Sequence, residues 1–234
     1  MAKALQIFSK ELKDYFVSPI AYIVICIFLL ISGWFFFSTF FLINQANLRT
    51  FFSMLPLIFP FVIPAVTMRL FAEELHIGSF EMLLTLPVRL NDVIVGKFLA
   101  CVAFVVLMMA PTLSYAVWAS FMGEIDWGPV IGGFFGAVLL GSAYSAIGIF
   151  ASATTRNQII AFIIGMVICF LLSLVDKMLF FFPAPMLPFI HYLGAGFHFE
   201  NVAKGIIDTR DMIYFLSIIF IALYGANLTM QEKR

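Results

Sequence analysis

Residues 18–43 read SPIAYIVICIFLLISGWFFFSTFFLI, and this stretch decides the fold class. The run from Pro19 to Ile43 carries no charged residue and exceeds the ~20 residues that a helix needs to cross a bilayer. Ser18 is a typical N-cap and Pro19 a typical first helical residue, so a membrane helix is predicted to begin here. The run is too long for the apolar region of a secretory signal and lacks a cleavage pattern, so we interpret it as a permanent span.

The rest of the chain repeats this character. Of 234 residues, 63% are apolar and 11% are charged, against about 25% charged residues in an average soluble domain. Thirteen basic residues balance 13 acidic ones, which argues against nucleic-acid binding. The composition excludes a soluble enzyme and a disordered chain, and it predicts an all-α integral membrane protein with six transmembrane helices. The predicted spans are Pro19–Ile43, Phe51–Leu70, Val93–Phe121, Val130–Ala153, Asn157–Val175 and Met212–Leu228.

The distribution of basic residues predicts the topology. With six spans both termini lie on one side, and nine Lys and Arg residues share that side while four lie opposite. Cytoplasmic loops carry an excess of Lys and Arg, so we expect both termini in the cytoplasm. The nine are Lys3, Lys10, Lys13, Arg69, Arg89, Lys97, Arg156, Lys233 and Arg234; the four are Arg49, Lys177, Lys204 and Arg210.

The N-terminal segment, residues 1–18, is predicted to be an amphipathic helix in the membrane interface rather than a solvated leader. At 100° per residue, one apolar stripe separates from a charged side. The stripe comprises Leu5, Phe8, Leu12, Tyr15 and Phe16, and the opposite side Lys3, Lys10, Glu11, Lys13 and Asp14.

A polar cytoplasmic segment, residues 69–92, follows the second predicted span. Helix-forming residues fill its first half, Gly78 and Ser79 interrupt it, and Pro87 ends it. Asn91 is a plausible cap for the third span, within which Lys97 is expected to extend back toward the headgroups. A plain polar loop is the alternative, but it does not explain why charges and a glycine gather here.

The longest outer segment, residues 176–211, is predicted to form a re-entrant or interfacial hairpin broken by prolines, then a short surface helix over residues 199–207. His191, His198 and Glu200 match no common metal-ligand spacing, so no metal site is expected. The cysteines Cys26, Cys101 and Cys169 lie in separate apolar runs, and we interpret them as buried core thiols. Pro111 predicts a tilt or kink in the third span.

Small residues in the fourth predicted span share one helix face and favour close helix packing. This packing is either inside one bundle, which we favour, or between subunits. The residues are Gly132, Gly136, Gly141 and Ser145.

The chain lacks the motifs of common membrane enzymes and ATPases. It has no H-E-x-x-H, no G-x-S-x-G and no phosphate loop, since Gly96 and Lys97 are followed by Phe98. No acidic residue lies near a span centre, and the two halves show no inverted repeat. We therefore expect a non-catalytic chain without cofactors, whose energy comes from a partner.

Two short stretches carry a family resemblance. Residues 72–87 read AEELHIGSFEMLLTLP and residues 95–98 read VGKF. Together they resemble the ABC-2 type transporter permeases, which typically show AEE, then GT-x-E-x-LL-T-x-P and VxGK. Ser79 replaces the usual Thr, and Leu75 and His76 stand where basic residues are frequent. The closing stretch, HFENVAKGIIDTRDMIYFL at 198–216, looks most like the subgroup associated with gliding motility, a relative of the nitrous-oxide maturation permeases.

The resemblance implies one transmembrane domain over residues 1–234, without a nucleotide-binding domain, in the bacterial cytoplasmic (inner) membrane. Two permease subunits, identical or paralogous, would pair with two cytoplasmic ATPase subunits that hold ATP and magnesium. Residues 69–87 would be the coupling helix of an exporter. The alternatives are a non-transporting anchor for a cytoplasmic machine and, less favoured, an independent channel or carrier. The expected coupling residues are Glu73, Glu74, Gly78, Ser79 and Glu81.

Overall fold

The fold is known from a computed structural model that describes residues 2–43, 47–80, 89–123, 125–178, 191–206 and 208–233. Every regular element within these ranges is a helix, which confirms the all-α prediction. Five helical units in the described ranges are long and apolar enough to cross a membrane. The shorter α9 (Gln158–Leu174) has 17 residues, so the six-span count stays a prediction.

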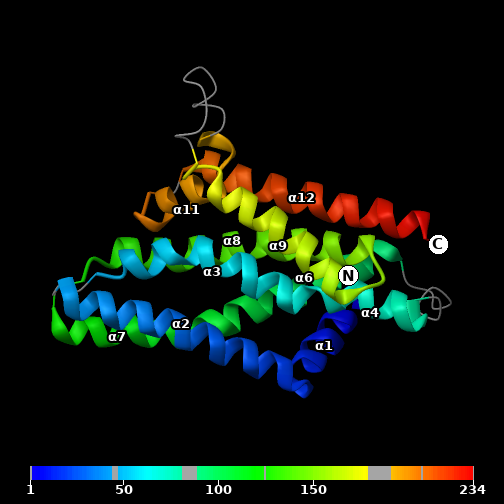
Figure 1. Cartoon of the computed structure of the whole chain (residues 1–234), viewed down its shortest axis with the longest axis horizontal. Helices are drawn as coiled ribbons and strands as arrows, with labels where there is room; N and C mark the ends of the chain where they lie inside the picture. The colour runs from blue at the N-terminus through cyan, green and yellow to red at the C-terminus, as the bar shows by residue number, and fades with distance from the viewer. Residues whose placement is uncertain are drawn as a thin grey trace.

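Helix α8 (Trp127–Thr154) is the central element of the bundle (Figure 1). It packs against α9 and against five other helices, because its small residues let neighbouring backbones and rings approach closely. A Cβ atom at Gly148, for example, would overlap the side chain of Thr67. Those helices are α3 (Arg49–Thr67), α4 (Arg69–Ile77), α6 (Leu90–Met109), α11 (Ala195–Ala203) and α12 (Thr209–Glu232).

Helix α3 contains three prolines at intervals of four residues, Pro56, Pro60 and Pro64, and all three are buried. Each proline lacks the N–H that would bond to the carbonyl four residues earlier. The helix ends at Thr67, where the N–H of Met68 still donates to the carbonyl of Pro64 at 2.9 Å. Helix α4 begins directly afterwards, so the two form one bent unit rather than a span and a separate loop.

The third predicted span is interrupted at Pro111 as expected. A 3-10 turn, η1 (Ala110–Thr112), joins α6 to α7 (Leu113–Met122). The predicted cap was wrong, because α6 begins at Leu90 with Arg89 in the extended N-cap position. Asn91 lies inside the helix, and its side-chain carbonyl accepts a hydrogen bond from Asn227 of α12.

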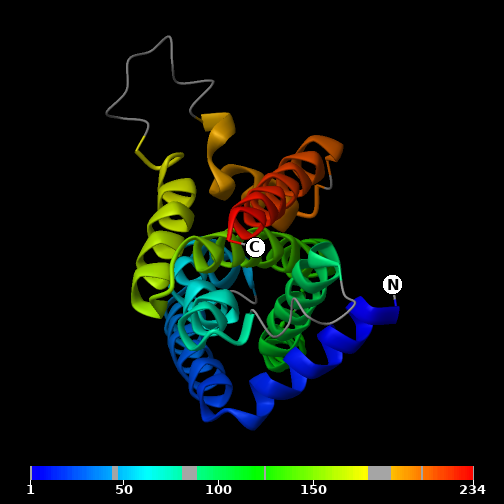
Figure 2. The same ribbon diagram turned by 90° about the vertical axis from the view of Figure 1, so that its right-hand side faces the viewer.

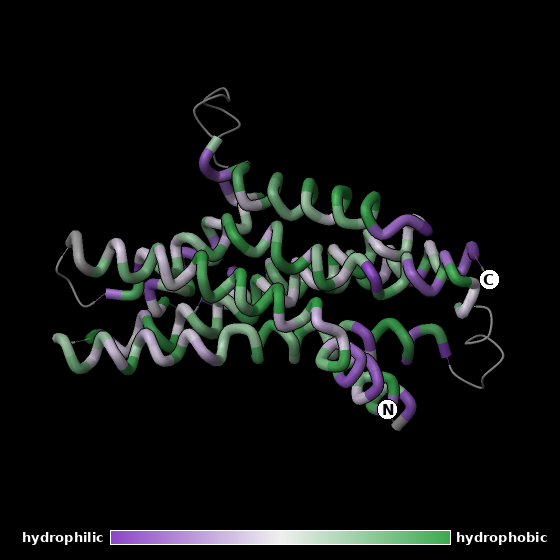
Figure 3. The backbone as a smooth tube through the Cα atoms, turned by 60° about the horizontal axis from the view of Figure 1, so that its bottom comes forward, coloured by the Kyte–Doolittle hydropathy of each residue, from purple (hydrophilic) through white to green (hydrophobic). Residues whose placement is uncertain are grey.

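Three helical segments that carry charged side chains lie together at one end of the bundle. Figure 1 places α1 (Ala2–Val17), α4 and the C-terminal end of α12 there, and Figure 2 views that end directly. Figure 3 shows that hydrophilic and hydrophobic residues alternate along α1, whereas the spans are mainly hydrophobic. The first span, α2 (Pro19–Ile43), starts from α1, and the Ser18 hydroxyl accepts from the Ile20 N–H at 3.4 Å, as expected of a cap.

The other end differs from prediction in two respects. The short helix α11 begins earlier than expected, and it is buried rather than on the surface, with Phe199 fully enclosed. Residues 179–190 of the predicted hairpin lie outside the described residues.

Among the cysteines, Cys101 and Cys169 are buried as predicted, whereas Cys26 is exposed on the outward face of α2.

Candidate functional site

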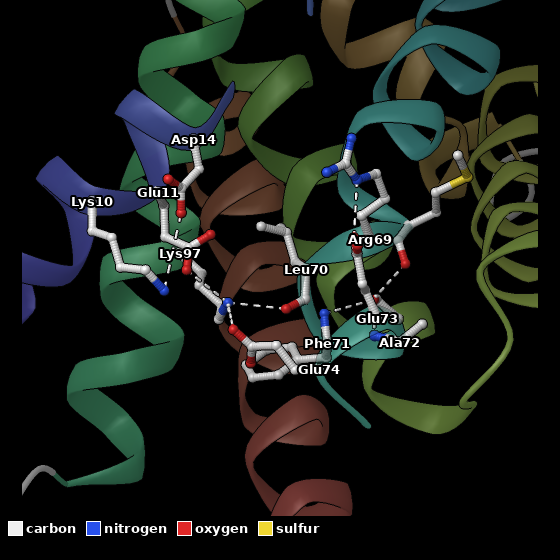
Figure 4. A network of polar contacts seen from close by, with 12 residues as sticks. Lys10, Glu11, Asp14, Arg69, Leu70, Phe71, Ala72, Glu73, Glu74 and Lys97 are labelled. Carbon is white, nitrogen blue, oxygen red and sulfur yellow. Dashed lines mark hydrogen bonds and ion pairs between the residues drawn. The ribbon is translucent and has the colours of Figure 1, made fainter. Parts of the chain in front are cut away.

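Lys97 of α6 is the centre of a buried polar network (Figure 4). Its side chain is 1% exposed, and its Nζ donates to Glu11 Oε1 at 2.9 Å, Glu74 Oε1 at 2.7 Å and the Leu70 carbonyl at 2.9 Å. Three acceptors use all three ammonium protons. The expectation that Lys97 extends to the headgroups was therefore wrong, because α1 and α4 bring carboxylates to it.

The network holds two carboxylates for one ammonium. The ring of Phe71 adds a cation–π contact, with Nζ 5.2 Å from its centroid. The Oε2 atom of Glu74 is buried and has no hydrogen-bond partner among the described residues. Since a buried charge requires a partner, removal of Lys97 would leave both acids uncompensated.

The stripe of α1 that faces α6 overlaps the predicted stripe only in part. Ala4 and Glu11 are buried on this side, whereas Leu5 is 60% exposed. The helical-wheel assignment of Glu11 to the outer side was wrong, because the wheel treats every charge as a surface residue and does not anticipate Lys97. Tyr15, on the same stripe, meets Cys101 with its hydroxyl 3.4 Å from Sγ, and burial raises the pKa of Tyr15.

The contact between α1 and α6 requires a small residue at Gly96, directly before the lysine. A Cβ atom at this position would lie 2.9 Å from the carbonyl oxygen of Ala4 and 2.9 Å from Cβ of Ile7. The backbone of α1 therefore crosses α6 at Gly96, one residue before the charged centre. This close approach positions Glu11 beside Lys97.

Helix α4 is also held from the side of α8. The hydroxyl of Ser152 accepts from the backbone N–H groups of Phe71 and Ala72, each at 3.0 Å, and donates to the carbonyl of Met68 at 2.9 Å. These N–H groups belong to the first turn of α4, which has no partners within its own helix. Sequence reasoning missed Ser152, which lies in an ordinary apolar span, 80 to 84 residues from its partners.

A second polar contact joins α4 to the start of α2. Arg69 donates from Nε to Glu73 Oε2 at 3.1 Å and from Nη1 to the Ser18 hydroxyl at 3.2 Å. The Arg69–Glu73 pair is partly exposed, so it contributes little stability by itself. Its effect is to fix α4 against the first turn of the first span.

The predicted coupling residues do not form one cluster among the described residues. Glu73 and Glu74 belong to the polar contacts above, whereas Gly78 ends α4 with φ +76°, a left-handed conformation that favours glycine. Ser79 lines a pocket beside the network. Glu81 lies outside the described residues.

The predicted packing residues contact parts of the same chain. A Cβ atom at Gly132 would meet the Val202 carbonyl, and one at Gly141 would meet Val105. Gly136 lies against Phe199, and Ser145 is fully buried with a hydroxyl that has no partner among the described residues. The three glycines thus serve contacts of α8 inside one bundle, in which Ser145 is also buried.

His198, near the opposite end of the bundle, has both ring nitrogens in contacts within the chain. His198 Nδ1 lies 2.5 Å from Asp211 Oδ1, and its Nε2 lies 2.8 Å from the Tyr192 carbonyl. Glu200 approaches Lys177 at 4.0 Å instead. Within the described ranges, no group of three or more His, Cys, Asp or Glu side chains could hold a metal ion.

The comparison with known families agrees with this arrangement. The family described as "ABC-2 family transporter protein" matches residues 5–223, a range that begins within α1 and ends within α12. A search of curated proteins found no match. Because the match covers most of the chain, this multi-pass membrane protein belongs to the ABC-2 transporter family.

Proposed function

We propose that this chain is the transmembrane subunit of an ATP-driven ABC-2 exporter, coupled to a separate cytoplasmic ATPase. Permeases of this family typically work with an ATPase partner. The observation that carries the proposal is the Lys97 network, which joins an interfacial helix, a candidate coupling helix and a span through one ammonium group. A displacement of α4 would therefore be transmitted to α1 and α6 together.

Helix α4 is suited to be moved by an ATPase partner. Its first turn is held by Ser152 and by the Leu70 contact to Lys97, while its last residue, Ile77, is 69% exposed. One end is thus fixed in the bundle, and the other is open to a partner at the end that carries α1. ATP-driven closure of the ATPase pair would move this tip and shift the spans between two arrangements.

The proposal includes the finer topology that the family implies. The chain would have six spans, with α9 as the shortest, and both termini would lie in the cytoplasm of a bacterium whose inner membrane holds the protein. A second permease subunit would complete the complex. Glu81 stays in the coupling set as a prediction, as does the link to gliding motility suggested by residues 198–216.

The test is a pull-down of the tagged full-length chain in mild detergent, followed by ATPase assays of the reconstituted complex. We expect a P-loop ATPase in roughly equal amount. Glu74→Gln should retain that partner but reduce the effect of the membrane subunit on its ATPase rate. Glu200→Gln, at the opposite end of the bundle, is the matched control and should behave as wild type.

Two results would contradict the proposal. If the chain purifies alone and stable in several detergents, the assignment of α4 as a coupling helix fails. If the ATPase is present but no added substrate changes its rate in vesicles, the chain is a non-transporting anchor for an ATPase-driven machine.

A further inference from the structure

A pocket of about 320 Å³ lies beside the Lys97 network, between α1, the first turn of α2 and α4. This volume is at the lower end of the ~300–1,000 Å³ range of small-molecule sites. Its wall combines charged groups with apolar side chains that include Ile20, Ala21 and Val66. Its charged groups are Lys10, Glu11, Asp14, Arg69, Glu73, Glu74 and Lys97.

The position of the pocket places it at a membrane surface. Ser18 and Ile20 begin one span, and Val66 ends another, and all three line the pocket. The common end of two neighbouring spans is where hydrocarbon meets water and where lipid headgroups lie. An occupant of this pocket is therefore in reach of the bilayer.

The pocket offers binding capacity for both signs of charge. Arg69 uses Nε and Nη1 within the chain, while no contact among the described residues occupies its Nη2. Arginine is well suited to phosphate, and the Ser18 hydroxyl lies next to it. On the other side, carboxylates outnumber cationic groups in the wall, since Glu11, Asp14, Glu73 and Glu74 line the pocket together with Lys10, Arg69 and Lys97.

The carboxylates favour a ligand with N–H donors. A charge-assisted hydrogen bond is stronger than a neutral one, so a cation that donates hydrogen bonds to these carboxylates gains more than a cation of equal charge that cannot. A primary ammonium donates three hydrogen bonds, whereas a trimethylammonium donates none.

From this geometry we infer that the pocket binds the phosphoethanolamine headgroup of a membrane lipid. The phosphate lies toward Arg69 and Ser18, the primary ammonium lies toward Glu73 and Glu74, and the apolar wall formed by Ile20 and Val66 faces the glycerol and the start of the acyl chains. The bound lipid fills the space between α1 and α4, which places it beside the proposed coupling helix. The inference does not depend on which side of the membrane this end occupies.

The experiment is native mass spectrometry of the delipidated full-length chain with equal amounts of dioleoyl phosphatidylethanolamine, phosphatidylcholine and phosphatidylglycerol. One phosphatidylethanolamine per chain should be retained about tenfold more than phosphatidylcholine, the difference expected from a charge-assisted hydrogen bond. Glu74→Gln should remove this preference, whereas Arg69→Gln should lower the retention of phosphatidylethanolamine and phosphatidylcholine alike, because both headgroups carry the phosphate. Lys13→Gln, on the same helix as Lys10 but outside the pocket, should preserve it.

A third variant and a soluble competitor extend the same experiment. Ser18→Ala leaves both charged sides intact and should weaken retention about threefold even if Glu74→Gln fails to fold. Equal retention of phosphatidylcholine, or a preference for phosphatidylglycerol, would overturn the inference, because neither headgroup has a primary ammonium. Displacement of the lipid by an equal concentration of soluble glycerophosphoethanolamine would overturn the assignment to a membrane lipid.

Discussion

Replacing Lys97 with methionine keeps the length of the side chain but leaves Glu11 and Glu74 without the cation that they share. Removal of one partner from a buried ion pair costs about 3–5 kcal/mol. The side chains of Glu11 and Glu74 are 10% and 17% exposed, so contact with water relieves part of this cost. We therefore expect about 3 kcal/mol, which corresponds to a factor of about 150 in the population of a locally opened state.

The assay uses the buried thiol of Cys101, whose Sγ lies 3.4 Å from the Tyr15 hydroxyl at the contact between α1 and α6. Cys26 is exposed and is replaced by serine in all proteins. With Cys169 also replaced, labelling by a thiol dye reports opening between α1 and α6. The matched protein retains Cys169 and lacks Cys101, and it reports global unfolding.

Lys97→Met should accelerate labelling of Cys101 about 150-fold while labelling of Cys169 changes little. The triple variant with Glu11→Gln and Glu74→Gln removes every charge of the network and should return to within about tenfold of wild type. Wild-type labelling of Cys101 in Lys97→Met would refute the claim that the network holds α1 against α6. Equal acceleration at both thiols would show a global loss of stability instead.

Other predictions address neighbouring contacts. Gly96→Ala places a Cβ atom 2.9 Å from the Ala4 carbonyl and should cost about 1–3 kcal/mol, visible as faster labelling of Cys101; an unchanged rate would mean that α1 shifts freely. Ser152→Ala removes the acceptor of two α4 N–H groups and should lower the melting midpoint in detergent by the equivalent of about 1–3 kcal/mol, whereas Ser114→Ala, on an exposed helix surface, should not. Burial raises the pKa of Asp176, so the folded state favours its neutral form and gains stability as the pH falls through that raised pKa toward the unfolded value. Asp176→Asn should therefore raise the melting midpoint most at neutral pH, and its difference from the wild-type midpoint should shrink toward pH ~4. A difference that stays constant with pH would contradict the raised pKa of Asp176.

The parts of the fold that depend on local sequence were predictable. The apolar run after Ser18 predicts α2 to its observed bounds, and Pro111 predicts the turn between α6 and α7. These features follow from hydrophobicity and backbone constraints within a few residues. Gly78 likewise ends α4, because a break in a helical pattern at glycine is a local signal.

The candidate site was only partly predictable, because its contacts join distant segments. Lys97 meets Glu74 and Glu11, 23 and 86 residues earlier in the chain. Periodicity alone places both a lysine and a glutamate in water, and only the tertiary fold shows that they satisfy each other in the interior. The pairing of glycine and lysine at 96–97 within an apolar run was the available signal for such a partner.

The prolines of α3 have a mechanical consequence. Because Pro56, Pro60 and Pro64 lack N–H groups, the carbonyls of Phe52, Pro56 and Pro60 receive no helical donor. The bending stiffness of α3 is therefore lowest along one line of its surface, the line that faces the bundle interior, while the hydrogen bonds of the opposite side stay continuous. A displacement of α4 would then bend α3 rather than tilt the whole helix. The amplitude of movement would decrease with distance from Met68, so the end of the bundle that holds α11 would stay still while the end that holds α4 moves.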